Sequence, residues 1–277
     1  MIIGVVGLGL IGGSLCKAIK ANTEHTVFGY DLDSAINSYA VMDGGIDAVL
    51  NDNNINECDY ILLSVYPKAT VEYLKEKAHI IKKDAVVIDC GGIKRGICER
   101  CFEIADEFEF HFIGGHPMAG LHHSGYKYSN ATLFNDASMI LTPKDTDDIN
   151  MLQDVTAFIK SIGFSSVTVT TPDKHDEIIA FTSQLAHVVS NAYVKSPTAE
   201  HHKGFSAGSY KDMTRVAWLN EHMWSELFLE NKEPLLFEID SIIGSLCEYR
   251  DAIQNNDAEK LTALLRDGRI AKEKIDG

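Results

Sequence analysis

The chain has 277 residues, of which 45% are hydrophobic, and this is enough for one large domain or two modest ones. Its formal net charge of −15 argues against binding to nucleic acid or to an anionic membrane, since both require a basic surface. Apolar runs such as YILLSVY at residues 60–66 are too short to span a bilayer, and the N-terminus lacks the charged segment of a signal peptide, so we expect a soluble cytoplasmic protein.

The first half of the chain alternates short apolar runs with amphipathic segments. This alternation predicts a mostly parallel sheet with helices on both faces. The expected helices lie at residues 12–21, 34–42, 70–79, 94–107 and 148–162. The expected strands lie at residues 2–6, 26–30, 60–65, 85–89, 111–113, 139–142 and 166–169.

The character of the sequence changes after Pro172, where helical patterns follow one another and no convincing strand remains. We therefore expect an α/β domain of residues 1–171 and an all-helical domain of residues 172–277. The helical domain is rich in Leu, Ile, Phe and Trp, which favours burial of an apolar face against a second copy in a homodimer. The helical patterns cover residues 173–194, 212–220, 222–231, 232–255 and 257–274.

A glycine motif, Gly7-x-Gly9-x-x-Gly12, follows the first strand and opens the first helix. In a dinucleotide-binding unit the first glycine makes a tight turn, the second lets the backbone approach the pyrophosphate, and the third packs helix on strand. The free N–H groups at the start of the helix then bind the phosphates. Asp31 ends the next strand, about 20 residues further on, as this type of fold requires. The sequence therefore predicts an N-terminal Rossmann-type dinucleotide-binding domain.

Asp31 also indicates which cofactor binds. Its carboxylate can accept hydrogen bonds from a ribose hydroxyl but would repel a 2′-phosphate, and Leu32 follows it rather than an arginine. We therefore expect NAD rather than NADP. The residues expected to contact the cofactor are Gly7, Leu8, Gly9, Leu10, Ile11, Gly12, Asp31 and Ser64.

The stretch FIGGHPMAG at residues 112–120 surrounds one histidine, His116, with glycines and a proline. Two interpretations are open. The stretch could be a Gly-Pro turn in which the histidine is incidental, or a backbone shaped to hold one imidazole. The motif alone does not choose between them.

The sequence contains six cysteines, and only Cys98 and Cys101 form a C-x-x-C pair. This pair falls inside a helical pattern, and no second pair stands at zinc-ligand spacing. We therefore interpret both as ordinary thiols and expect no metal site. Disulfides are not expected in a reducing compartment.

Together these motifs resemble the prephenate/arogenate dehydrogenases of tyrosine biosynthesis. The resemblance is carried by the glycine loop, by GGHPMAG and HDEIIAFTSQLAH, and by GSYKDMTRVA followed by MW, and it spans nearly the whole chain. It implies the oxidative decarboxylation of a cyclohexadienol, in which hydride passes to NAD, carbon dioxide departs and the ring becomes aromatic. For prephenate the product is 4-hydroxyphenylpyruvate.

The resemblance also implies the site residues. His116 would accept the proton of the ring hydroxyl, a task that suits a neutral imidazole. Arg215 would grip a substrate carboxylate through its planar fork. The remaining residues implied are His187 in the same pocket, Asp212 as an orienting partner, and Gly208 and Trp224 at positions that enter a partner subunit's site.

Two positions depart from the pattern of the family. Gly92 stands where the family often has a serine whose hydroxyl lies near the ring hydroxyl of the substrate, so a hydrogen bond is lost unless water replaces it. His122 stands where the family often has an acidic residue. An acid there could meet the ammonium of arogenate, whereas a histidine cannot, and we therefore expect a preference for prephenate.

Three alternatives remain at this point. The chain could be an arogenate dehydrogenase, or a β-hydroxyacid dehydrogenase, although it lacks the glycine-rich run that usually precedes the catalytic lysine of that family. It could also be a non-catalytic NAD-binding sensor, which would not need His116 and Arg215 together.

Overall fold

The computed structural model describes residues 1–121, 123–146 and 148–276. The strands are β1 (Ile2–Val6), β2 (Thr26–Tyr30), β3 (Ala48–Val49), β4 (Tyr60–Leu63), β5 (Val86–Asp89), β6 (His111–Pro117), β7 (Ser138–Pro143) and β8 (Ser166–Val169). The helices between them are α1 (Leu10–Asn22), α2 (Ser34–Met42), α3 (Pro67–Lys77), α4 (Arg95–Phe108) and α5 (Ile149–Ser161).

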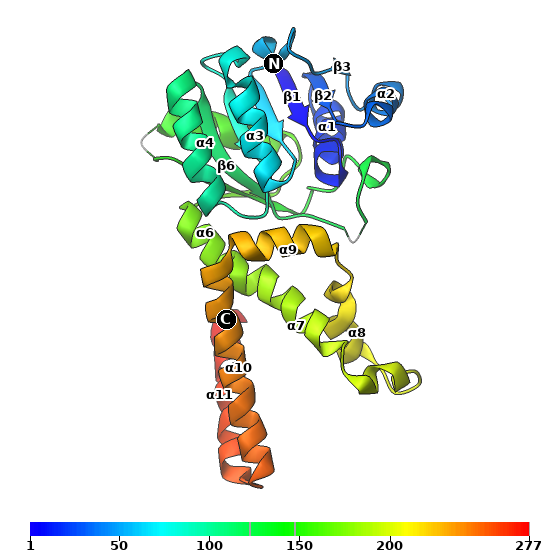
Figure 1. The fold of residues 1–277 in the computed structure, drawn as a ribbon, viewed down its shortest axis with the longest axis vertical. Helices are drawn as coiled ribbons and strands as arrows, with labels where there is room; N and C mark the ends of the chain where they lie inside the picture. The colour runs from blue at the N-terminus through cyan, green and yellow to red at the C-terminus, as the bar shows by residue number, and fades with distance from the viewer. Residues whose placement is uncertain (122, 147, 277) are drawn as a thin grey trace.

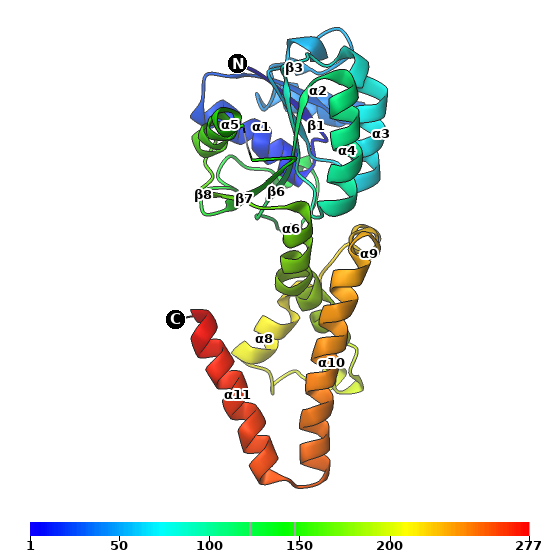
Figure 2. The same cartoon turned by 90° about the vertical axis from the view of Figure 1, so that its left-hand side faces the viewer.

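The strands form one sheet in the order β3-β2-β1-β4-β5-β6-β7-β8, and all neighbours run parallel except β6 and β7. α1 and α5 lie on one face of the sheet, while α3 and α4 lie on the other (Figure 2). A core of buried apolar side chains fills the space between the sheet and the helices on each face. The predicted mostly parallel, helix-covered sheet is therefore confirmed. Only β3 was not predicted, because two residues show no periodicity.

β6 is longer than the sequence predicts. Its first part pairs with β5 in parallel, and from Ile113 to Pro117 it pairs with β7 in the antiparallel direction. Gly114 and Gly115 make this close packing possible, since a Cβ on Gly114 would lie 2.2 Å from the Thr142 hydroxyl oxygen. His116 consequently lies on a strand, opposite Ile140, and not in a turn.

The second part of the molecule is helical and lies below the sheet in Figure 1. A continuous helix descends from the sheet, and α9 crosses beneath the sheet's edge (Figure 1). The helical elements are α6 (Pro172–Ile179), a π-helical segment (Ala180–Leu185), α7 (Ala186–Tyr193), α8 (Gly208–Thr214), α9 (Glu221–Glu230), α10 (Lys232–Gln254) and α11 (Ala258–Asp276).

α10 and α11 form a splayed pair that extends away from the sheet (Figure 2). Large apolar side chains on this pair are exposed, among them Phe237, Leu246 and Leu265. None of the helices in the described part of the chain is long and apolar enough to cross a membrane. Since β8 ends at Val169 and α6 begins at Pro172, we propose the domain boundary between residues 171 and 172.

The packing of β6 predicts unequal effects for two glycines of the same motif. A Cβ on Gly115 would lie 2.5 Å from the Asp89 carbonyl oxygen, whereas a Cβ on Gly120 would meet nothing within 4 Å. Gly115→Ala should therefore lower the free energy of unfolding by about 1–3 kcal/mol, the usual cost of overpacking. Gly120→Ala is the matched control and should change it little. Urea denaturation of both variants checks this, and equal effects would contradict it.

Candidate active site

The glycine loop forms an anion-binding cradle at the carboxyl end of β1. Gly7 has a φ of +87°, and a Cβ there would lie 2.5 Å from the Ser64 carbonyl oxygen. A Cβ on Gly12 would lie 1.9 Å from the Gly7 carbonyl oxygen, while one on Gly9 would meet nothing within 4 Å. α1 starts after Gly9 without a side-chain cap, which leaves its first N–H groups free for phosphate. The backbone therefore fits a pyrophosphate.

Asp31 is held rigidly beside this loop. One carboxylate oxygen accepts a hydrogen bond from the Leu8 N–H at 2.9 Å, and the other accepts one from the Asp33 N–H at 3.0 Å. The Asn37 side chain bonds to both the N–H and the carbonyl of Asp31. Since each carboxylate oxygen has a further lone pair, Asp31 is positioned to accept from ribose hydroxyls.

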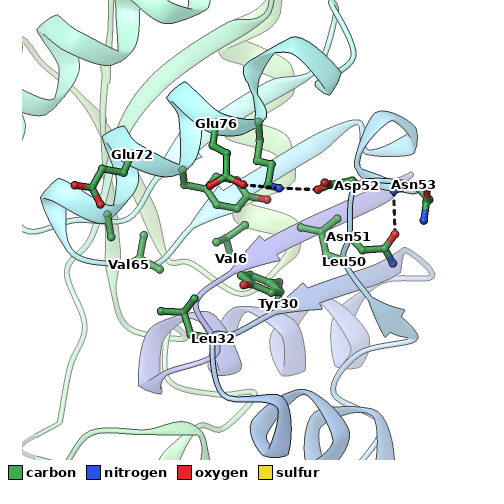
Figure 3. Close-up of a pocket in the computed structure, with 13 residues that line it drawn as sticks. Val6, Tyr30, Leu32, Leu50, Asn51, Asp52, Asn53, Val65, Glu72 and Glu76 are labelled. Atoms are coloured by element: carbon green, nitrogen blue, oxygen red, sulfur yellow. Dashed lines mark hydrogen bonds and ion pairs between the residues drawn. The ribbon is translucent and has the colours of Figure 1, made fainter.

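A cavity of about 600 Å³ lies next to Asp31, between the strand ends and α3. Val6 and Tyr30 line it from the strands, and Glu72 and Glu76 from α3 (Figure 3). Lys77, the one lysine in the lining, is paired at 2.7 Å with Asp52 and at 2.8 Å with Glu76. The lining is therefore net acidic, which suits an uncharged adenosine and disfavours a further phosphate.

Ser64 follows β4 at the same edge of the sheet, and its carbonyl oxygen would lie 2.5 Å from a Cβ on Gly7. Its buried hydroxyl forms a hydrogen bond with the Cys90 thiol, and this contact opposes the rise that burial causes in the pKa of Cys90. The glycine loop and Asp31 together fit the predicted dinucleotide.

His116 lies at the carboxyl edge of the sheet in a chain of three side chains. Its Nδ1 is 2.8 Å from Nε2 of His175 on α6, and Nδ1 of His175 is 2.7 Å from a carboxylate oxygen of Asp176. Because the carboxylate can only accept, His175 donates to it from Nδ1 and has Nε2 free as an acceptor. His116 therefore donates from Nδ1, and this leaves its Nε2 as an unprotonated, basic nitrogen.

The carboxylate of Asp176 sits at the N-terminus of α4. It accepts hydrogen bonds from the backbone N–H groups of Lys94 at 2.7 Å and Arg95 at 2.8 Å. The unpaired N–H groups and the dipole of a helix stabilise a negative charge at this position. Asp176 is therefore held as the acceptor that fixes the tautomer of His175.

A buried ion pair between Lys94 and Asp89 lies beside these histidines, and both side chains are fully buried. Asp89 also accepts from the N–H groups of Gly91 at 2.9 Å and Gly115 at 3.1 Å. It thereby joins the end of β5, the following loop and β6 immediately before His116.

Burial and the positive charge of Lys94 keep the histidines neutral. Burial lowers the pKa of His116 well below 6.5, and the neighbouring His175 and Lys94 lower it further. Burial also lowers the pKa of His175, although its bond to Asp176 opposes this shift. His116 is thus an imidazole, not an imidazolium, at neutral pH.

Helix α9 connects the hydrogen-bonded residues His116, His175 and Asp176 to a second cluster of predicted residues. A Cβ on Gly92 would lie 3.7 Å from the Leu227 side chain and 3.9 Å from Nε2 of His116. Trp224 lies one turn before Leu227 on α9 and stacks on His187, with ring centroids 3.8 Å apart. His116, Gly92, Trp224 and His187 therefore line one region beneath the sheet.

His187 is held by a hydrogen bond to the backbone one turn earlier, and the positive charge of Arg215 acts on its imidazole. Its Nδ1 donates to the Ser183 carbonyl at 2.9 Å, in the π-helical segment. Burial lowers the pKa of His187, and the charge of Arg215 contributes to this shift. Arg215 is exposed in the turn after α8.

Two of the other predicted residues lie on α8, away from the sheet (Figure 1). Gly208 and Asp212 lie exposed on α8, and no side-chain bond to Asp212 is present in the described part of the chain. His122 lies outside the described residues.

Comparison with known protein families decides the assignment. The model of the prephenate dehydrogenase nucleotide-binding domain matches residues 15–168, and that of the prephenate dehydrogenase dimerization domain matches residues 171–267. The chain belongs to the prephenate dehydrogenase family. The predicted family is confirmed, and so is the predicted fold, a nucleotide-binding domain followed by a helical one. The β-hydroxyacid alternative is therefore excluded as the family of this chain.

Individual relatives cover nearly the whole length of the chain. It is 30% identical to the cyclohexadienyl dehydrogenase of Zymomonas mobilis, over 98% of this chain and 94% of that protein. The A. aeolicus prephenate dehydrogenase in complex with hydroxyphenyl propionate and NAD+ has a TM-score of 0.86 at 29% identity, with 99% of this chain and 98% of that chain covered. Synechocystis arogenate dehydrogenase has a TM-score of 0.83 at 25% identity, with 99% and 100% covered. The family thus establishes a dehydrogenase class and not a substrate.

The sequence patterns did not reveal four residues of this candidate site. His175 and Asp176 open the motif HDEIIAFTSQLAH, and an adjacent acid and histidine at its start was the available signal. Asp89 and Lys94 flank the position of Gly92 in the sequence, but nothing in their spacing indicated a buried ion pair.

Proposed function

We propose that the chain is an NAD-dependent prephenate dehydrogenase, which converts prephenate to 4-hydroxyphenylpyruvate in tyrosine biosynthesis. The observation that carries this proposal is the chain Asp176–His175–His116, which leaves Nε2 of His116 free to accept a proton at the edge of the dinucleotide-binding sheet. A non-catalytic NAD sensor would not require a neutral imidazole held in one tautomer.

The reaction follows from the chemistry of this nitrogen. Nε2 of His116 accepts the proton of the ring hydroxyl, while His175 accepts the hydrogen bond from Nδ1 and supports the positive charge that develops on the ring. NAD, when bound by the glycine loop and Asp31, supplies the hydride acceptor. Loss of carbon dioxide from the opposite ring position then makes the ring aromatic.

Substrate binding is assigned to the cluster around α9. Arg215 would bind a carboxylate of the substrate through a charge-assisted, bidentate contact, and His187, stacked on Trp224, would line the pocket. Since Gly92 has no side chain beside Nε2 of His116, we propose that a water molecule takes the place of the missing hydroxyl.

We further propose that the chain acts as a homodimer through its helical domain. The match to a dimerization domain and the exposed apolar residues of α10 and α11 support this assignment. Gly208, which lies exposed on α8, would then enter the site of the partner subunit, as would Trp224, and Asp212 would act as an orienting partner. 

The proposed substrate is tested by NADH formation with prephenate and with arogenate. We expect prephenate to have the higher kcat/KM, because His122 offers no negative charge to an ammonium. His122→Glu should move the ratio toward arogenate. Equal or better use of arogenate by the unaltered chain would overturn the substrate, and no turnover of either would overturn the activity.

His116→Asn tests the proposed base. Asparagine keeps a hydrogen-bonding group but has no useful basicity, so kcat should fall by roughly 10²–10⁴. In the unaltered chain, turnover should decline only well below pH 6.5, because burial, His175 and Lys94 keep the pKa of His116 low. Steady-state kinetics across pH measure both effects.

Two controls accompany the His116 variant. NAD affinity should hardly change, because the dinucleotide contacts lie at residues 7–12 and at Asp31. Arg215→Ala should instead raise KM through loss of a carboxylate contact. A His116→Asn protein with nearly unaltered kcat would refute the assignment of the base.

Asp31→Ala tests the choice of cofactor. The unaltered chain should prefer NAD over NADP by more than tenfold in kcat/KM, which corresponds to about 1.4 kcal/mol. Asp31→Ala should narrow this ratio, since the carboxylate no longer repels a 2′-phosphate. Asp33→Asn is the matched control, because it removes a charge at the same strand end and keeps an oxygen to cap α2. Comparable use of both cofactors by the unaltered chain would contradict the proposal.

A further inference from the structure

A buried amide network ties the corner between α9 and α10 to the helix that carries His175. Asn231, at this corner, is fully buried, and its Nδ2 donates to the Asp176 carbonyl at 2.9 Å and to Oε1 of Gln184 at 2.8 Å. Gln184, in the π-helical segment, donates in turn to the Leu227 carbonyl at 3.2 Å. Both donors of the Asn231 amide are therefore used, and both contacts lead to the site.

The network ends on the residue that orients the histidine chain. Asp176 is held from both sides, by the N–H groups of Lys94 and Arg95 on its carboxylate and by Asn231 on its carbonyl. A shift of this backbone would move His175, which is adjacent in sequence and holds Nδ1 of His116. The Asp176 carbonyl accepts both the helical hydrogen bond from the Ala180 N–H and the bond from Asn231, and the second of these ties it to the α9–α10 corner.

The unused oxygen of Asn231 argues against a purely stabilising role. Its Oδ1 is buried and has no hydrogen-bonding partner within the described residues. A buried acceptor without a partner leaves a desolvation cost that an apolar residue of similar size would avoid. Asparagine at this position is explained by what its two N–H groups hold.

We infer that Asn231 is a positioning residue for His116, acting through Asp176 and His175, an inference that rests on the proposed function. The charged or titratable groups around the two histidines are Asp176 on α6, Asp89 at the end of β5 and Lys94 before α4. α9 adds Glu226, which is adjacent to Leu227. Asn231 carries no charge, so its replacement changes the geometry of the site and not its charge.

Asn231→Leu tests the inference, since leucine has a similar volume and donates no hydrogen bond. We expect kcat to fall by about 10- to 100-fold, the usual cost of a small misplacement of a catalytic group. The pH below which kcat declines, the acid limb of its pH profile, should move up toward 6.5. If the hydrogen bonds from Asp176 to His116 loosen, water reaches His116, and burial then lowers the pKa of His116 less. KM and NAD affinity should change less than kcat.

Two further variants separate positioning from folding. Gln184→Met keeps the bond from Asn231 to Asp176 and should give a smaller change in the same direction. Ser190→Ala is the matched control, because Ser190 is a buried polar residue on α7 whose hydroxyl has no partner in the described part of the chain. It should leave both kcat and the acid limb unaltered.

Titration of the His116 imidazole by NMR provides a readout independent of turnover. If the unaltered chain oxidises neither substrate, the proposed function fails, and this titration still tests whether Asn231 positions His116. A folded Asn231→Leu protein with unaltered kcat, acid limb and imidazole titration would overturn the inference. If that variant does not fold, an unaltered kcat and acid limb in Gln184→Met would overturn it instead.

Discussion

The hydrogen-bond chain from Asp176 through His175 to His116 is the interaction on which the site depends. It crosses between the two parts of the molecule, since His116 lies on β6 and the other two residues lie on α6. Because a carboxylate can only accept, the direction of every bond in the chain is set from one end. The free nitrogen at the other end is therefore a consequence of the docking of helix against sheet.

The surrounding fold serves to hold the two ends of this chain. At the sheet, Gly114 and Gly115 let β6 pack closely enough for Asp89 to bond to the backbone next to His116. At the helix, the N-terminus of α4 supplies two N–H groups to Asp176. Both ends meet the short segment between β5 and α4, which carries Gly92 and Lys94. This segment therefore couples the cofactor-binding sheet to the helical domain.

Much of the fold and the cofactor loop could be predicted from the sequence, because strand and helix periodicity and the glycine spacing are local signals. The extension of β6 through His116 could not, since its antiparallel pairing depends on β7, which is distant in sequence. The π-helical turn within a uniformly helical pattern also has no local signal. His175 and Asp176 were overlooked because only the folded chain brings them to His116, and the pair Asp89–Lys94 because burial was not visible in its spacing.

The proposed base depends on residues from both domains, so neither domain can be treated as an independent module. A Rossmann-type domain is commonly regarded as an exchangeable unit that brings its own cofactor to any substrate domain. Here the imidazole belongs to that unit, while the group that decides which of its nitrogens carries the proton belongs to the other. A fusion of this sheet to a foreign helical domain would retain the dinucleotide cradle. It would lose the contacts from His175 and Asp176 that fix the tautomer of His116. The proposed catalytic unit is accordingly the interface between the two domains, and neither domain alone.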